Sequence, residues 1–311
     1  AAVMAQAARI FRVRDAPPPV APDSLVAAAR NAWEWAREHP NAYYEQRRLN
    51  RRFDPDIQTG AYGDTDLQDE FVWAATELYA TTGEQRFVST LDTVSHSSAP
   101  VPSWSQVRTL GYFTLLRLDP TNQQQSSVEK LQSQVRELVL AKADSLIQGA
   151  DTTAFHVPMG STADDFVWGS NAVAANQGLL LTWAYRLTGA RTYLDGALAN
   201  LDYLLGRNAT GYAFVTGVGE YSSQNPHHRP SVSDGVDPPV PGLLVGGPNS
   251  GQQDECEYPS DAPARSYTDT VCSYASNEIA INWNAPLAYL AAATEALQYD
   301  AGYAAGKPSS P

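Results

Sequence analysis

Two short stretches of this chain share one pattern, Leu78-Tyr79-Ala80-Thr81-Thr82-Gly83 and Ala184-Tyr185-Arg186-Leu187-Thr188-Gly189. Each closes an apolar helical stripe with a glycine suited to the position just after a helix, and another helical segment follows. The distance between the two glycines corresponds to two helical hairpins of roughly 50 residues. Because a helical hairpin cannot bury its apolar face alone, such hairpins must pack side by side.

The helical period continues through most of the chain. Apolar stripes lie in residues 3–11, 25–36 and 71–79, and further helices are predicted over 84–94, 104–118, 124–149, 171–187, 190–205 and 277–298. No period-2 alternation extends over more than a few residues. We therefore expect an all-α fold of about nine helices, an α/α toroid without its first few helices. The opening residues already have a helical pattern, so we expect a fragment of a longer protein.

Composition and charge narrow the function. The chain has 311 residues, 43% of them hydrophobic, and a formal net charge of −13. This charge opposes binding to nucleic acid or to an anionic membrane surface, but it leaves neutral polysaccharides open as partners. No apolar run reaches the 18 or so residues that a membrane span requires. The seven Trp and sixteen Tyr residues could fill a core or stack on sugars.

A long segment, residues 206–276, has little periodicity and is rich in Gly, Pro, Ser and Asn. It contains Thr216-Gly217-Val218-Gly219 and Pro226-His227-His228-Arg229, and Asn277-Glu278-Ile279-Ala280-Ile281-Asn282-Trp283-Asn284-Ala285 follows it. Upstream lie Trp168-Gly169-Ser170-Asn171 and Gly60-Ala61-Tyr62-Gly63-Asp64. In this order, these motifs resemble glycoside hydrolase family 9, the inverting cellulases. The similarity covers most of residues 1–298.

The resemblance implies an incomplete (α/α)6 toroid with about nine of twelve helices. Residues 1–300 would be part of the catalytic barrel, and residues 301–311 a tail or linker stub. Glu278 would be the general acid that protonates the leaving glycosidic oxygen. Taken alone, Glu278 at the start of a helix could simply complement the helix dipole.

The resemblance also implies sugar contacts. His227 and Arg229 would hydrogen-bond sugar hydroxyls, unless they only form ion pairs with nearby acids. Asp269 could support Glu278 or form a local turn. Three aromatic residues are candidate sugar platforms or core residues: Trp168, Tyr274 and Trp283.

The catalytic base is missing from the pattern. An inverting glycosidase needs a second carboxylate to activate water. The family supplies it from an Asp-Ala-Gly-Asp motif in its N-terminal third, and this sequence has no such motif. We therefore assign no base in this chain and expect it upstream of Ala1. The chain alone would then be inactive.

Two further sites concern stability. The family has a structural calcium at the acidic stretch whose candidate ligands are Thr65, Asp66, Asp69 and Glu70, although these residues could instead cap the next helix. The chemistry requires no cofactor, and the His and Cys spacing predicts no zinc site. Cys256 and Cys272 lie in one irregular loop, which favours a disulfide over free thiols and fits a secreted, extracellular bacterial protein.

We therefore predict an endo-β-1,4-glucanase that cleaves cellulose or a related β-glucan. It would be a monomer when complete, with no nucleic-acid or membrane partner. Two alternatives remain: an exo-acting member such as a cellobiohydrolase, β-glucosidase-like or glucosaminidase-like enzyme, and a non-catalytic glucan-binding fragment.

Overall fold

The computed structural model describes residues 1–14, 17–93, 96–119 and 125–304. Within these ranges the chain forms twelve α-helices and two short 3-10 helices, and the only β-structure is a few isolated bridges. Nine of these α-helices have eight or more residues, in agreement with the predicted number. In the same ranges, no helix combines the length and apolarity needed to cross a membrane.

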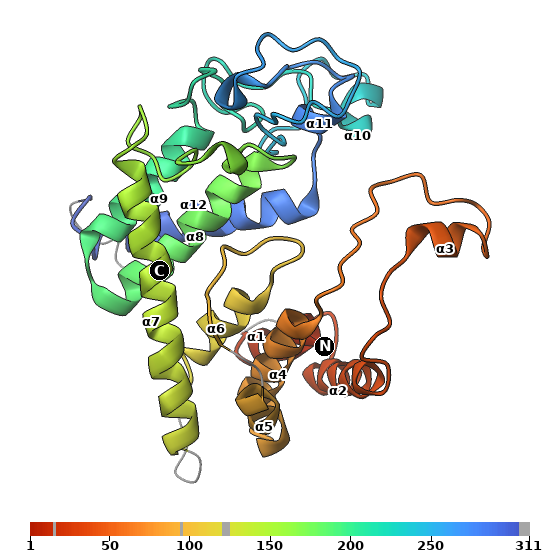
Figure 1. Cartoon of the computed structure of the whole chain (residues 1–311), viewed down its shortest axis with the longest axis vertical. Helices are drawn as coiled ribbons and strands as arrows, with labels where there is room; N and C mark the ends of the chain where they lie inside the picture. Colours follow the sequence, from red (N-terminus) through yellow and green to blue (C-terminus); the bar gives the residue numbers. More distant parts are fainter. Residues whose placement is uncertain (15–16, 94–95, 120–124, 305–311) are drawn as a thin grey trace. The chain divides into compact units, whose positions relative to one another are not determined.

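The chain divides into two compact units, Ala1–Val139 and Leu140–Pro311, and the division falls within the long helix α7 (Gln125–Ala150). In the first unit, α4 (Gln68–Thr82) is the central helix. It packs against α1 (Ala2–Arg12), α5 (Gln85–Thr93) and α6 (Arg108–Leu115), and it also contacts α2 (Pro22–Glu38) (Figure 1). A short helix, α3 (Gln46–Asn50), lies in the connection between α2 and α4.

A buried polar cluster joins three of these helices. The Glu77 carboxylate on α4 is fully buried and pairs with Arg9 on α1. It also accepts hydrogen bonds from the Trp73 indole at 3.1 Å and from the Thr114 hydroxyl of α6 at 2.7 Å. The buried charge is thus fully paired, which is the condition for burying a carboxylate without a large cost.

In the second unit, α8 (Ser170–Thr188) packs against both α9 (Arg191–Leu204) and α12 (Ile281–Leu297). The long irregular segment between α9 and α12 is predicted correctly. It contains only two short α-helices, α10 (Arg229–Ser233) and α11 (Tyr274–Asn277), and a 3-10 turn, η2 (Pro263–Arg265). It is nevertheless well anchored, because Phe214, Leu244 and Tyr267 are buried in the same core as α8 and α12.

The glycines that end the two repeated motifs have the predicted role. Gly83 and Gly189 adopt left-handed backbone conformations with φ of 71° and 72° directly after α4 and α8. Their N–H groups donate to the carbonyls of Tyr79 and Tyr185 and so satisfy helix-end acceptors. A side chain at either position would be strained by the positive φ.

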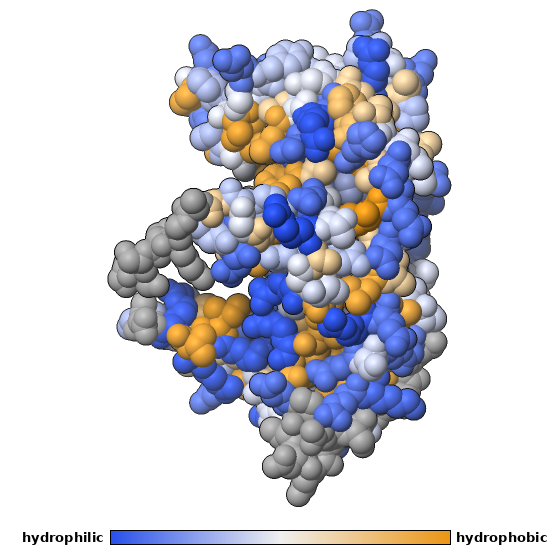
Figure 2. Space-filling model, turned by 90° about the vertical axis from the view of Figure 1, so that its left-hand side faces the viewer, coloured by the Kyte–Doolittle hydropathy of each residue, from blue (hydrophilic) through white to orange (hydrophobic). Residues whose placement is uncertain are grey.

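The surface exposes several large apolar side chains, among them Trp35, Phe53 and Ile281. Figure 2 shows apolar groups gathered at several places among hydrophilic ones. Residues 305–311 of the predicted tail lie outside the described residues. The residues just before them are packed, since Ala301 is buried and the Tyr303 hydroxyl donates to Asp195.

Candidate active site

Glu278 lies in an extended connection and not, as predicted, at the start of a helix. The predicted helix over residues 277–298 begins only at Ile281, and Glu278 follows the last residue of α11 with φ of −68° and ψ of 153°. The physical reason is pairing with other segments. The backbone of Glu278 forms a parallel bridge with His227, and Ile279 forms an antiparallel bridge with Val245. The helix-dipole argument for Glu278 therefore does not apply.

These bridges fix the backbone on both sides of Glu278. The His227 N–H donates to the Asn277 carbonyl at 2.8 Å, and the Gly246 N–H donates to the Glu278 carbonyl at 3.0 Å. Gly246 has no room for a side chain, because a Cβ there would lie 3.1 Å from the Ser276 carbonyl oxygen. The backbone around Glu278 is thus fixed by hydrogen bonds to two other segments, and this fixes the position from which the carboxyl group extends.

The Glu278 side chain contacts Trp168, the first of a series of neighbouring aromatic rings. The Trp168 indole N–H donates to its Oε2 at 3.3 Å, and the Trp168 ring lies 5.6 Å from the Tyr274 ring. The Tyr274 ring in turn lies 6.0 Å from the His227 imidazole. Burial raises the pKa of the Glu278 carboxyl, while the Trp168 hydrogen bond and the charge of His227 oppose this effect. A raised pKa keeps a carboxylic acid protonated, as a general acid requires.

Trp168 and Tyr274 are also accessible to a ligand, with 40% and 39% of their surface exposed. Trp283 is not. Only 6% of its surface is exposed, and its indole packs against Gly169, where a Cβ would lie 2.6 Å from its Nε1. The prediction that Trp283 is a sugar platform is therefore wrong, because its ring fills the core of the second unit.

His227 and Arg229 line one pocket of about 260 Å³ together with His228. The His227 Nδ1 contacts the Val271 carbonyl at 2.6 Å, which leaves Nε2 for other partners. Arg229 is exposed and is the first residue of α10. The backbone that leads to it is extended as far as His228. The His228 Nδ1 lies 2.9 Å from the Ser231 hydroxyl of α10, so this nitrogen has a local partner.

Asp269 supports the backbone around the site. Its two carboxylate oxygens accept from the N–H groups of Gln224 and Asn225 at 2.8 and 2.9 Å, and Oδ1 also accepts from the Asn277 amide at 3.1 Å. The Asn277 Oδ1 accepts from the Tyr267 hydroxyl at 2.7 Å. Asp269 therefore positions the residue before Glu278, and its oxygens are already occupied.

The sequence reasoning did not single out Asn277 and Tyr267. Both are buried, and Asn277 also donates to the Asn225 carbonyl at 2.6 Å. The asparagine next to Glu278 in the motif was the one available signal. No pattern in the sequence indicates that a tyrosine ten residues upstream reaches the same amide.

A disulfide joins Cys256 to Cys272. Cys272 directly follows Val271, whose carbonyl contacts His227. The disulfide therefore connects the residues around Cys256 to the residues next to His227. The Asp254 carboxylate, two residues before Cys256, accepts from the Ala275 N–H of α11 at 2.9 Å. This part of the segment is therefore attached to α11 by the Asp254 hydrogen bond and to the residues just before α11 by the disulfide.

The acidic stretch that leads into the first turn of α4 contains buried oxygens without partners. Asp69 is fully buried; its Oδ2 accepts from the Val107 N–H at 2.6 Å, whereas its Oδ1 has no partner. One oxygen each of Asp64 and Glu70 is likewise buried and unpartnered. Burial raises the pKa of Glu70 to about 8, and the nearby carboxylates of Asp69 and Asp64 add to this effect. Buried oxygens without hydrogen-bond partners are of the kind that bind a cation.

Of the four predicted calcium ligands, two have a buried oxygen without a partner, Asp69 and Glu70. Thr65 and Asp66 are exposed, and Asp66 accepts from the Gln68 N–H at the start of α4, as a capping residue does. In the described part of the chain, no three His, Cys, Asp or Glu side chains are arranged to hold a metal ion. A calcium ion here would therefore need neutral oxygens, such as backbone carbonyls, beside the carboxylates.

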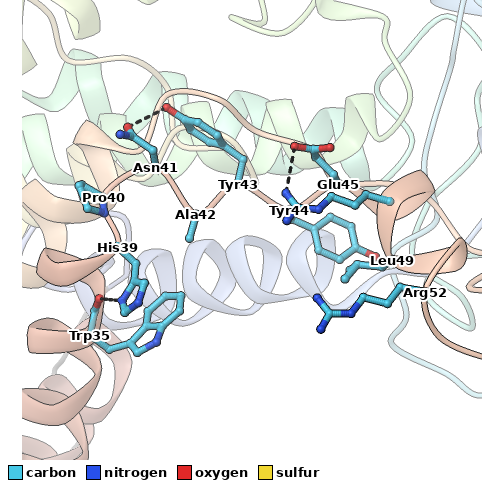
Figure 3. A pocket seen from close by; sticks show the side chains of 11 residues that line it. Trp35, His39, Pro40, Asn41, Ala42, Tyr43, Tyr44, Glu45, Leu49 and Arg52 are labelled. Carbon is cyan, nitrogen blue, oxygen red and sulfur yellow. Dashed lines mark hydrogen bonds and ion pairs between the residues drawn. The ribbon is translucent and has the colours of Figure 1, made fainter.

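A larger pocket of about 670 Å³ lies in the first unit, around α3 and the end of α2. Figure 3 shows Trp35 stacked on His39 at one side and Tyr44 beside Arg52 at the other. Its only acid is Glu45, so it has no pair of carboxylates for hydrolysis. None of the predicted site residues lines it.

Comparison with known proteins identifies relatives of the chain. The model of the family described as glycosyl hydrolase family 9 matches residues 1–291. A xyloglucan-specific endo-β-1,4-glucanase of Bacteroides ovatus is 45% identical over 298 residues, which cover 96% of this chain and 50% of that protein. A cellulose 1,4-β-cellobiosidase of Acetivibrio thermocellus is 32% identical, over 94% of this chain and 34% of its own length. The chain thus spans half of these relatives or less.

Solved structures agree with this relationship. A Bacteroides ovatus protein of the same family superposes with a TM-score of 0.87 at 43% identity, over 95% of this chain and 52% of that one. A thermostable endoglucanase from Alicyclobacillus acidocaldarius gives a TM-score of 0.80 at 33% identity, over 94% and 54%. These likenesses confirm the predicted fold class, part of an (α/α)6 toroid.

Proposed function

Because the chain belongs to glycosyl hydrolase family 9, we propose that the protein containing it hydrolyses β-1,4-glucosidic bonds in a β-glucan by an inverting acid–base mechanism. Glu278 is the general acid. It donates its proton to the leaving glycosidic oxygen, while a second carboxylate removes a proton from the attacking water. The observation that carries the proposal is the Glu278 carboxyl, whose pKa is raised by burial and which is held by the Trp168 indole at 3.3 Å.

The surrounding groups have distinct tasks in this proposal. Trp168 and Tyr274 offer exposed aromatic faces next to Glu278, on which a pyranose ring can stack. His227 Nε2 and the Arg229 guanidinium donate hydrogen bonds to sugar hydroxyls. Asp269 acts through Asn277 and keeps the acid in place. Tight positioning matters, because small displacements of an acid from its substrate reduce the rate strongly.

No catalytic base is assigned among these residues. Asp269, the nearby carboxylate, already accepts three hydrogen bonds and is not free to activate water. We expect the base in the part of the family's length that this chain does not span. An inverting enzyme would hold it roughly 6.5–9.5 Å from Glu278.

We expect endo-action, that is, cleavage at bonds within the β-glucan backbone. The Bacteroides ovatus relative, at 45% identity, acts on xyloglucan, and this favours xyloglucan or cellulose-like chains as the substrate. The cellobiosidase relative keeps exo-action as the alternative within the family. Product sizes distinguish the two: an endo-enzyme releases a range of long oligosaccharides first, whereas a cellobiosidase releases cellobiose from the beginning.

The decisive experiment uses the full-length gene product that contains this chain. Glu278→Gln keeps the size of the side chain and its contact with Trp168 but removes the transferable proton. We expect at least about a hundredfold loss of kcat on xyloglucan or carboxymethylcellulose, measured as reducing ends. Glu295→Gln, an exposed position on α12, is the control and should retain activity. Unchanged activity in Glu278→Gln would refute the assignment.

A non-catalytic glucan-binding protein is the second candidate. It is favoured by the exposed rings of Trp168 and Tyr274, which can bind a sugar chain without cleaving it. In that case the full-length product would bind glucan through Trp168 and Tyr274, and it would release no reducing ends under any condition.

Two accessory features belong to the same proposal. A structural calcium ion beside Asp69 and Glu70, with neutral oxygens as its other ligands, would satisfy their buried oxygens and would take no part in the chemistry. The Cys256–Cys272 disulfide supports secretion, because such bonds persist in oxidising compartments. We also expect the complete enzyme to be a monomer.

A further inference from the structure

A second pocket of the Leu140–Pro311 unit has a different lining from the surroundings of Glu278. It measures about 510 Å³, within the range of roughly 300–1,000 Å³ that is typical of ligand sites. Its walls come from three parts of the long segment, residues 210–221, 257–259 and 265–269. Trp168, His227, Tyr274 and Glu278 do not line it. It is therefore a separate cavity in the same unit.

One wall is an aromatic platform. The rings of Tyr212 and Tyr221 stack at 4.1 Å with an angle of 28° between their planes. Tyr221 is 56% exposed, so the face of its ring opposite to Tyr212 is open. Tyr212 also packs edge-on against the buried Tyr267 at 5.1 Å. The platform is thus fixed from behind before any ligand binds, which reduces the entropic cost of binding.

The rim carries two charged side chains that have no partner in the described part of the chain. Arg265 ends η2, and Glu257 follows Cys256, so the disulfide restrains its backbone. Both are exposed, and neither forms an ion pair or hydrogen bond there through its side chain. A planar guanidinium and a carboxylate, beside an open aromatic face, suit the adjacent hydroxyls and the apolar face of a pyranose ring.

The charges of the pocket and of the whole chain indicate that the ligand is uncharged. Glu257 and Asp269 line the pocket opposite a single arginine, and the chain as a whole has a net charge of −13. An anionic polymer would therefore be repelled. We propose that this pocket is a second glucan-binding site, which holds a neutral sugar chain on Tyr221 between Arg265 and Glu257 and whose lining does not include Glu278. The choice of β-glucan as the sugar rests on the proposed function.

The test measures binding and hydrolysis separately in the full-length gene product. Cellohexaose and a xyloglucan heptasaccharide are titrated calorimetrically into the Glu278→Gln variant, which does not consume them. We expect two classes of site. Tyr221→Ala and Arg265→Gln in that background should each weaken one class about tenfold or more and leave the other unchanged. Tyr44→Ala, an exposed tyrosine of the other unit, is the matched control.

Hydrolysis by the otherwise unaltered enzyme separates the two proposals. Tyr221→Ala should leave kcat/KM on short oligosaccharides unchanged and reduce binding to long chains. A single class of site, or equal losses in Tyr221→Ala and Tyr44→Ala, would overturn the second site even if hydrolysis is normal. Tyr221-dependent binding without any hydrolysis would support the second site and contradict the proposed function instead.

Discussion

Glu278 illustrates how the surroundings of a residue set its chemistry. Burial raises the pKa of its carboxyl, whereas the Trp168 N–H and the charge on His227 lower it. The balance is an upward shift, so the folded chain holds this proton more tightly than the unfolded chain does. That is the property an acid catalyst needs near neutral pH, and it has a cost in stability once the group ionises.

This cost gives a prediction for the chain itself. Between the unfolded pKa near 4.5 and the higher folded pKa, folding takes up a proton, so this residue's contribution to stability falls as pH rises. Glu278→Gln removes that dependence. We expect the free energy of unfolding of Glu278→Gln, relative to the unaltered chain, to increase from pH 4 to pH 7. Urea denaturation at both pH values measures it.

The exposed Glu295 provides the control, since Glu295→Gln makes the same chemical change at the surface of α12. A difference for Glu278→Gln that stays constant from pH 4 to pH 7 would contradict the raised pKa of Glu278.

At the level of structural elements, the disulfide stabilises the loop between α10 and α11. Cys256 and Cys272 are separated by 16 positions, and closing a loop of that length stabilises a fold by about 3 kcal/mol in the chain-entropy model. We expect the double variant Cys256→Ser with Cys272→Ser to lose stability of that order in the Leu140–Pro311 unit. Chemical denaturation measures the loss, and the reduced unaltered chain should match the variant. Equal stability of all three would show that the hydrogen bonds of Asp254 suffice to hold the loop.

The same elements show what the sequence could predict. Helices with a clear apolar period, and the glycines that end α4 and α8, were predicted because both signals are local. Glu278 was misplaced at a helix start, because its extended conformation depends on pairing with His227 and Gly246, which are distant in sequence. Whether Trp283 is a platform or a core residue could not be decided from the sequence, because a tryptophan on a helix gives no sign of the glycine that lets it pack inside.

The site was predictable to a similar degree. Glu278, His227 and Trp168 could be identified from the sequence, because each lies in a short motif that resembles the family. The support from Asp269 and Tyr267 to Asn277 depends on three segments that meet only in the folded chain. Long-range hydrogen bonds of this kind have no sequence period, so the sequence could indicate the acid but not what holds it.

The chain as a whole consists of two compact units, each with features that a different reagent can address. The unpaired oxygens of Asp69 and Glu70 belong to the first unit, and the disulfide belongs to the second. We therefore expect calcium to protect only residues 1–139, by roughly 2.7 kcal/mol at a concentration of 100 times its Kd. Reduction should expose only residues 140–311. Hydrogen exchange read by mass spectrometry assigns each effect to its segment.

Asp69→Asn is the matched variant for this experiment, because it removes a charge from the proposed calcium site and keeps the side chain's size. It should abolish the calcium effect and leave the response to reduction intact. Protection that spreads equally over both units would mean that they unfold as one cooperative body. Calcium protection that persists in Asp69→Asn would place the ion elsewhere. The predicted pattern, in contrast, requires that each unit has a core able to unfold separately, as the contacts of α4 in one and α8 in the other suggest.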